Sequence, residues 1–113
     1  MKYKEDDLLM AVVRYLKLQY PYVLFTHIAN ERKASPIAGA RLKAKGVMAG
    51  MPDLLIFRRS YCFIGLAIEL KIAPNKLKPN QIIVLNQLES EGWQCNVCFD
   101  LDSAIEIIDN YLK

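Results

Sequence analysis

Two charged side chains interrupt an otherwise apolar segment, Ala67-Ile68-Glu69-Leu70-Lys71-Ile72. Alternate residues of a β-strand point to opposite faces, so Glu69 and Lys71 share one face and the aliphatic residues share the other. A charge in the middle of an apolar strand is costly unless it is paired or used by a ligand. The segment therefore predicts a strand that presents one acid and one amine to a common site.

A second apolar segment supplies a third charged group. Asp53 follows Pro52 at the start of the apolar run 54–57, which a short polar loop separates from the run 62–72. Two strands joined by such a loop pair in antiparallel fashion, and this pairing brings Asp53 to the end of the strand that contains Glu69. We expect two carboxylates and one ammonium group to converge there. The competing interpretation makes the strand charges a solvated face of an edge strand and the aspartate a turn residue.

Helical and strand patterns precede these two segments. Residues 5–19 carry apolar side chains at intervals of one, three and four, which predicts an amphipathic helix that ends before Pro21. The β-branched and aromatic residues of 23–28 predict a strand. A polar, basic stretch follows from residue 29 to residue 50, with a short helix expected over 37–45.

The C-terminal part alternates helix, strand and helix. The spacing of Ile82, Ile83, Leu85 and Leu88 predicts a helix that ends at Gly92. A strand is expected over 95–99, and Ser103 stands at capping-box spacing before a last helix. The order αβ(α)ββαβα predicts an α/β fold, a mixed β-sheet flanked by helices, in one domain spanning residues 1–113.

Composition restricts the class of protein. Hydrophobic residues make up 53% and charged residues 24%, which is typical of a globular domain and excludes a disordered chain. No apolar run reaches 18 residues and the N-terminus turns acidic at residue 5, so we expect no membrane partner, no signal peptide and a cytoplasmic location. The formal net charge of +3 permits a nucleic-acid partner without requiring one.

Cys95 and Cys98 lie three residues apart on a predicted strand and face opposite sides, so we interpret them as packed thiols rather than a metal chelate.

The charged residues resemble the PD-(D/E)xK nuclease superfamily, because Pro52-Asp53 is followed sixteen residues later by Glu69-Leu70-Lys71. A wider set of segments is similar to the VRR-NUC domain, the virus-type replication and repair nuclease family. These segments are His27-Ile28-Ala29-Asn30-Glu31, Gly39-Ala40-Arg41-Leu42-Lys43-Ala44-Lys45-Gly46, Gly50-Met51-Pro52-Asp53-Leu54-Leu55 and Leu77-Lys78-Pro79-Asn80-Gln81. The resemblance runs over about residues 5–112 and is to the stand-alone form found in phages and bacteria.

This resemblance implies a restriction-endonuclease-like core and divalent-metal-dependent cleavage of DNA. It implies that Mg²⁺, or alternatively Mn²⁺, is held by Asp53, Glu69 and the Leu70 backbone carbonyl, and that Lys71 is the catalytic lysine. Hard oxygen ligands suit Mg²⁺, and a lysine beside them can orient water or balance charge on the phosphate. The remaining positions matched to the family are Gln81 of the following helix, Glu5 of the first helix with Asp6 and Asp7 as rivals for that place, and the lesser candidates His27, Asn30 and Glu31.

The basic stretch is a candidate DNA-contacting surface. Arg41 and Lys45 are four residues apart and share one face of the short helix, with Lys33 and Lys43 nearby. The alternative is a solvated face without a partner.

The kinship with Holliday junction resolvases that the resemblance implies leads to our principal hypothesis, a structure-selective DNA endonuclease that acts on branched DNA as a homodimer. The competing hypotheses are a nuclease for flaps or ordinary duplex, a non-catalytic DNA-binding module of the same fold, and an unrelated α/β domain.

Overall fold

The computed structural model describes residues 4–29 and 35–113, which form the predicted order of elements. The bounds of these elements are α1 (Lys4–Gln19), β1 (Phe25–His27), α2 (Pro36–Ala44), β2 (Leu54–Ile56), β3 (Gly65–Leu70), α3 (Pro79–Ser90), β4 (Trp93–Cys98) and α4 (Leu101–Leu112). The mixed α/β fold class is therefore confirmed. In the described ranges, no helix combines the length and the apolar character that crossing a membrane would require.

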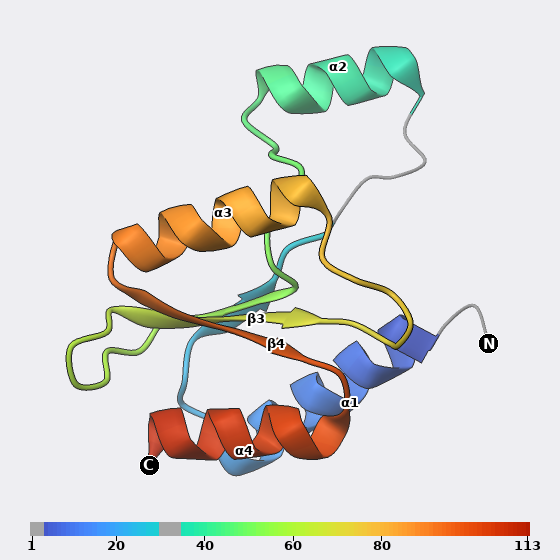
Figure 1. Ribbon diagram of the computed structural model, residues 1–113. Helices are drawn as coiled ribbons and strands as arrows, with labels where there is room; N and C mark the ends of the chain where they lie inside the picture. The colour runs from blue at the N-terminus through green and yellow to red at the C-terminus, as the bar shows by residue number, and fades with distance from the viewer. Residues whose placement is uncertain (1–3, 30–34) are drawn as a thin grey trace.

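The four strands form one mixed sheet in the order β1-β2-β3-β4. The first two pairs are antiparallel, with Leu54 opposite Ile68, and β3 pairs with β4 in parallel, with Leu70 opposite Cys98. α3 covers one face of the sheet, while α1 and α4 cover the other (Figure 1). Because β3 lies between two strands and under helices on both sides, all six of its residues are buried. Glu69 thus lies on an inner strand, Lys71 directly follows that strand, and both are buried, so the solvated edge-strand interpretation is wrong.

The helices on the lower face pack through a regular apolar stripe. Leu8, Val12 and Leu16 of α1 are buried at helical spacing, as the sequence predicts, against Ile108 of α4 and the sheet. The hydroxyls of Tyr15 and Tyr20 both donate to Asp109 Oδ1 at 2.6 Å and hold the pKa of Asp109 below its ordinary value. This polar clamp fastens α1 to α4 at the rim of the core.

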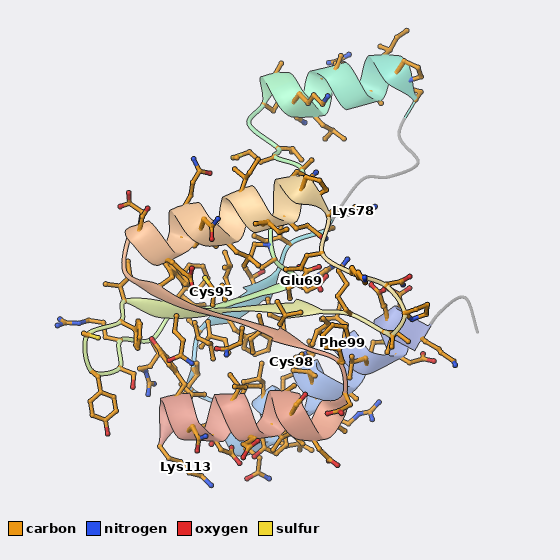
Figure 2. All side chains as sticks on the ribbon, in the orientation of Figure 1. Glu69, Lys78, Cys95, Cys98, Phe99 and Lys113 are labelled. Carbon is orange, nitrogen blue, oxygen red and sulfur yellow. The ribbon has the colours of Figure 1, made fainter. Side chains whose placement is uncertain are left out.

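The two strand cysteines face opposite layers, as predicted. Cys98 is buried on the α4 side, whereas the Cys95 thiol lies on the α3 side, 3.6 Å from the Leu85 carbonyl oxygen (Figure 2). Burial raises the pKa of both thiols, that of Cys95 to about 11. Neither thiol is therefore arranged as a reactive or chelating group.

The last helix begins earlier than the sequence predicts, and the third shows an unexpected buried row. α4 begins at Leu101 rather than after Ser103, because the Asp100 side chain accepts from the Ser103 backbone N–H and caps the helix first. In α3, Ile82 and Ile83 are exposed, and the buried row consists of Gln81, Val84 and Leu85. The strand bounds are also shorter than expected, since β1 covers only Phe25–His27.

Candidate active site

Asp53 is fixed at the entrance to β2 by three hydrogen bonds. Its carboxylate Oδ2 accepts from the Leu70 backbone N–H at 2.8 Å. Its backbone carbonyl oxygen lies 2.7 Å from His27 Nδ1 and accepts from the Ile28 N–H at 3.2 Å. A carbonyl oxygen can only accept, so Nδ1 of His27 carries its hydrogen and donates. The acid thus lies against the end of β3, as the antiparallel pairing predicts.

Glu69 and Lys71 form a buried ion pair beside it. Lys71 Nζ lies 3.7 Å from Glu69 Oε2, and each residue is only 4% exposed. Lys71 follows the last residue of β3, and its backbone N–H donates to the Cys98 carbonyl oxygen at 3.0 Å. The lysine backbone is therefore fixed to the end of β4, and its buried ammonium group is paired with Glu69.

Gln81 orients Glu69 from the start of α3. Its side-chain Nε2 donates to Glu69 Oε2 at 3.0 Å, and its Oε1 accepts from the Lys78 backbone N–H at 2.8 Å. Because the Lys78 N–H can only donate, it fixes which end of the Gln81 amide faces Glu69. In Figure 2, Glu69 lies on the side of the sheet that α3 covers, and Lys78 lies at the beginning of that helix.

A close backbone contact holds α3 against the loop that precedes Asp53. Gly50 has a φ of +92°, and a Cβ at this position would lie 2.7 Å from the Asn80 carbonyl oxygen. Only glycine accepts both the left-handed conformation and this approach. Gly50 therefore sets the distance between the Asp53 loop and the start of the helix that contains Gln81.

The two acids are electrostatically coupled. Burial and, to a lesser extent, the charge of Asp53 raise the pKa of Glu69 to about 7, against the lowering effect of Lys71. Burial also raises the pKa of Asp53, against the lowering effect of the hydrogen bond from Leu70. One lysine does not compensate the buried carboxylate of Glu69 and the partly buried carboxylate of Asp53, so the site favours a further cation.

Glu5 is the first-helix acid that lies toward this pair. Its charge raises the pKa of both Asp53 and Glu69, and its Oε2 accepts from Asn75 Nδ2 at 3.0 Å. Asp6 and Asp7 are exposed, and neither contributes to these shifts. Asn75, which the sequence did not single out, therefore positions the third carboxylate.

The basic residues of the second helix stand apart from the acids. Arg41 and Lys43 lie on α2 and Lys45 follows it, and all three are exposed. No hydrogen bond or ion pair joins them to Asp53 or Glu69 in the described part of the chain. Lys33, Asn30 and Glu31 fall outside the described residues.

The donor set fits a hard divalent cation. Mg²⁺ is usually held by one or two carboxylates and completes its shell with waters and substrate phosphates. Asp53 and Glu69 supply such a pair, and the Leu70 backbone adjoins both. Within residues 4–29 and 35–113, no three His, Cys, Asp or Glu side chains form a closed metal cage. The arrangement suits an open Mg²⁺ site rather than a structural zinc site.

Known proteins support the same family. A solved structure, a VRR_NUC domain protein, is similar over 96% of this chain and 87% of its own, with 28% identity and a TM-score of 0.81. A second, a VRR_NUC domain, covers 90% of this chain and 95% of its own with 18% identity and a TM-score of 0.55, which bears on the fold alone. No curated protein sequence matches the chain. The model of the VRR-NUC domain matches residues 2–99. The chain therefore belongs to the VRR-NUC family of nuclease domains, with a PD-(D/E)xK-like nuclease fold.

Proposed function

We propose that the chain is a Mg²⁺-dependent endonuclease that hydrolyses DNA phosphodiester bonds and prefers branched DNA, as Holliday junction resolvases do. One observation carries the proposal. The acid Asp53 is hydrogen-bonded to the end of β3, where the buried pair of Glu69 and Lys71 lies. Burial of that pair has no evident structural purpose, because a packed apolar pair would fold at least as well.

Asp53, Glu69 and the Leu70 carbonyl would hold the metal, with Mn²⁺ as an alternative occupant. When bound, the ion supplies Lewis-acid polarisation of the scissile phosphate. Glu5 lies toward the same two acids and would add a third negative charge to attract the metal ion. Because the pKa of Glu69 is raised to about 7, a fraction of the protein carries a proton there at neutral pH, and cation binding would release it.

Lys71 supplies the positive charge that the reaction needs near the phosphate. The lysine is buried and paired with Glu69, so its charge lies where solvent screens it weakly. Preorganised charge of this kind stabilises negative charge that develops on the phosphate oxygens in the transition state. The same ammonium group can orient the attacking water, while Gln81 keeps Glu69 from rotating away.

The preference for branched DNA rests on symmetry and charge. Resolution of a four-way junction requires two paired cuts, and one chain of this size supports one such site. A homodimer with two-fold symmetry presents two sites at once. The exposed cations of α2 would contact phosphates, since the helix carries no acidic residue to repel them.

Cleavage of labelled four-way junction and matched linear duplex, in Mg²⁺ or EDTA, tests the proposal. We expect the wild type to cut the junction only with metal, and Lys71→Ala and Asp53→Asn to abolish cutting. Glu106→Gln, an exposed change on α4, serves as the control. Cutting of duplex or flap DNA without a preference for the junction would support nuclease activity and contradict the proposed resolvase-like preference. Binding of DNA without any metal-dependent cutting would favour the non-catalytic module.

A further inference from the structure

The α2 helix lacks the support that the other helices have. It is nine residues long and none of its residues is buried, whereas α1, α3 and α4 each bury several. It stands beyond α3, away from the two layers of the core (Figure 1). Helices shorter than about 12 residues are only marginally stable in water without packing. Ile37 of α2 is 77% exposed, so its side chain does not anchor the helix either.

A pocket of about 240 Å³ lies between α2, the loop that follows it and the start of α3. Apolar side chains of Leu42, Val47 and Met48 line it on the α2 and loop side. The lysines Lys43 and Lys78 line it as well, and none of the described residues that line it is acidic. The pocket therefore combines apolar surface with positive charge.

Gln81 connects this pocket to the acids. The residue lines the pocket and also donates to Glu69 Oε2 at 3.0 Å. Gln81 thus links the pocket to Glu69, one of the two proposed metal-binding acids. An occupant of the pocket would contact the same side chain that orients this acid.

The chemistry of the pocket favours one unpaired nucleotide. An apolar wall suits the flat face of a base, and two ammonium groups suit the phosphates on either side of it. The volume is below the range of about 300 to 1,000 Å³ that is usual for drug-sized ligands, so a base fits and a duplex does not. A base stacked inside a duplex cannot enter such a pocket unless it is unpaired or extruded.

We propose that this pocket receives a single unpaired base of the DNA strand next to the scissile phosphate. This inference rests on the proposed function, and it narrows the substrate to DNA with an unpaired nucleotide beside the cut. It also explains why α2 is unsupported in the free protein, because the bound strand would complete its packing. The occupant is nucleic acid rather than a second copy of the chain, since the lining is basic and the chain itself has a net charge of +3.

Binding to two bulged duplexes tests the inference without requiring cleavage. One duplex carries a single extra 2-aminopurine nucleotide, and the other carries an abasic nucleotide at the same place. In EDTA, we expect the wild type to bind the first about tenfold more tightly, because only that duplex buries a base on the apolar wall. The abasic duplex retains the same phosphates and controls for electrostatic attraction.

Two substitutions on α2 provide a matched pair. Gly39 lines the pocket and a Cβ there meets nothing within 4 Å, so Gly39→Leu fills the space and favours the helix. We expect this variant to lose the tenfold difference, whereas Ala40→Leu, next to it but outside the pocket, retains it. Val47→Trp is a second filling variant from the loop, in case the first alters the helix.

The outcomes separate this inference from the proposed function. Equal wild-type affinity for the two bulged duplexes, or binding to neither, overturns the inference even if metal-dependent cutting is observed. A base-dependent difference without any cutting supports the pocket and contradicts the nuclease proposal instead. Sedimentation of the variants measures their oligomeric state and tests whether a second copy of the chain occupies the pocket. If Gly39→Leu changes the oligomeric state while the wild type binds both duplexes equally, the pocket is a contact between copies.

Discussion

Replacement of Glu69 by glutamine should stabilise the metal-free protein at pH 8. Glu69 is 4% exposed, and burial raises its pKa from the ordinary 4.5 to about 7. A raised carboxyl pKa means that the folded state binds the proton more tightly than the unfolded state. The resulting stability is fully present below pH 4.5 and is lost as the pH rises through about 7. At pH 8 the ionised side chain therefore weakens the fold.

The size of this effect follows from the shift. Each unit of pKa corresponds to about 1.4 kcal/mol, so a rise from 4.5 to about 7 corresponds to about 3 kcal/mol at most. The shift already includes the attraction of Lys71, so loss of that ion pair needs no separate correction. Glutamine has nearly the same shape and still accepts from Gln81 through its carbonyl oxygen. We expect Glu69→Gln to raise the free energy of unfolding by about 1 to 3 kcal/mol at pH 8.

Thermal unfolding in EDTA, at pH 5 and pH 8, provides the measurement. For a chain of this size 1 kcal/mol corresponds to roughly 4 °C in Tm, so the variant should melt about 4 to 12 °C above the wild type at pH 8. The difference should shrink to about 1 kcal/mol or less at pH 5, where the carboxyl is protonated in the folded state but largely ionised in the unfolded state. Glu106→Gln makes the same chemical change on the surface of α4 and should alter Tm at neither pH. A less stable Glu69→Gln protein at pH 8, or an equal gain at both pH values, would refute the reasoning.

Three further changes test separate parts of the molecule. Gly50→Ala places a methyl group 2.7 Å from a main-chain oxygen of α3, so the free energy of unfolding should fall by about 1 to 3 kcal/mol in urea titrations. An unchanged midpoint would contradict the close contact. Gln81→Leu should lower metal-dependent cleavage at least tenfold by releasing Glu69, whereas Gln87→Leu on the exposed side of the same helix should retain it. Arg41→Glu should weaken DNA binding and reduce the log–log salt slope by about 0.9 per lost phosphate contact, and an identical slope would exclude α2 from the interface.

The position of the site along the chain could be predicted from the sequence because two simple rules act there. The period of two places Glu69 and Lys71 on one face, and a short loop between apolar runs forces antiparallel pairing. Together they bring Asp53 to the Leu70 backbone, where the structure places it. The stripe of α1 and the opposite facing of the two strand cysteines follow from the same periodicities.

The start of the last helix could not be predicted because two short polar residues compete for it. Asp100 and Ser103 can each cap a helix, and local spacing favoured the serine. In the structure β4 ends at Cys98, so the chain turns at once and Asp100 reaches the free N–H groups first. The sequence is compatible with capping by Asp100 or by Ser103, and the position at which the preceding strand ends determines which residue caps the helix.

Hydrophobicity alone does not identify the buried face of α3. Hydrophobicity favours Ile82 and Ile83 as core residues, yet both are exposed and Gln81 is buried. The helix turns its polar N-terminal residue inward because Glu69 needs a donor there. The preference for burying isoleucine rather than glutamine is not followed here, as is expected at a functional site, where function conflicts with optimal packing.

The burial of polar groups locates the site independently of any family resemblance. Among the described residues, the buried polar or charged side chains are Glu69, Lys71 and Gln81, and Glu69 contacts the other two. Everything else in the core is apolar, so the cost of burying charge is concentrated at a single point. Folding alone does not require that cost, since an apolar trio would pack as well. The trio is therefore best explained by a ligand that the folded chain has to bind. The expected gain in stability of Glu69→Gln measures the free energy of unfolding that the chain loses by keeping an ionisable acid at this position.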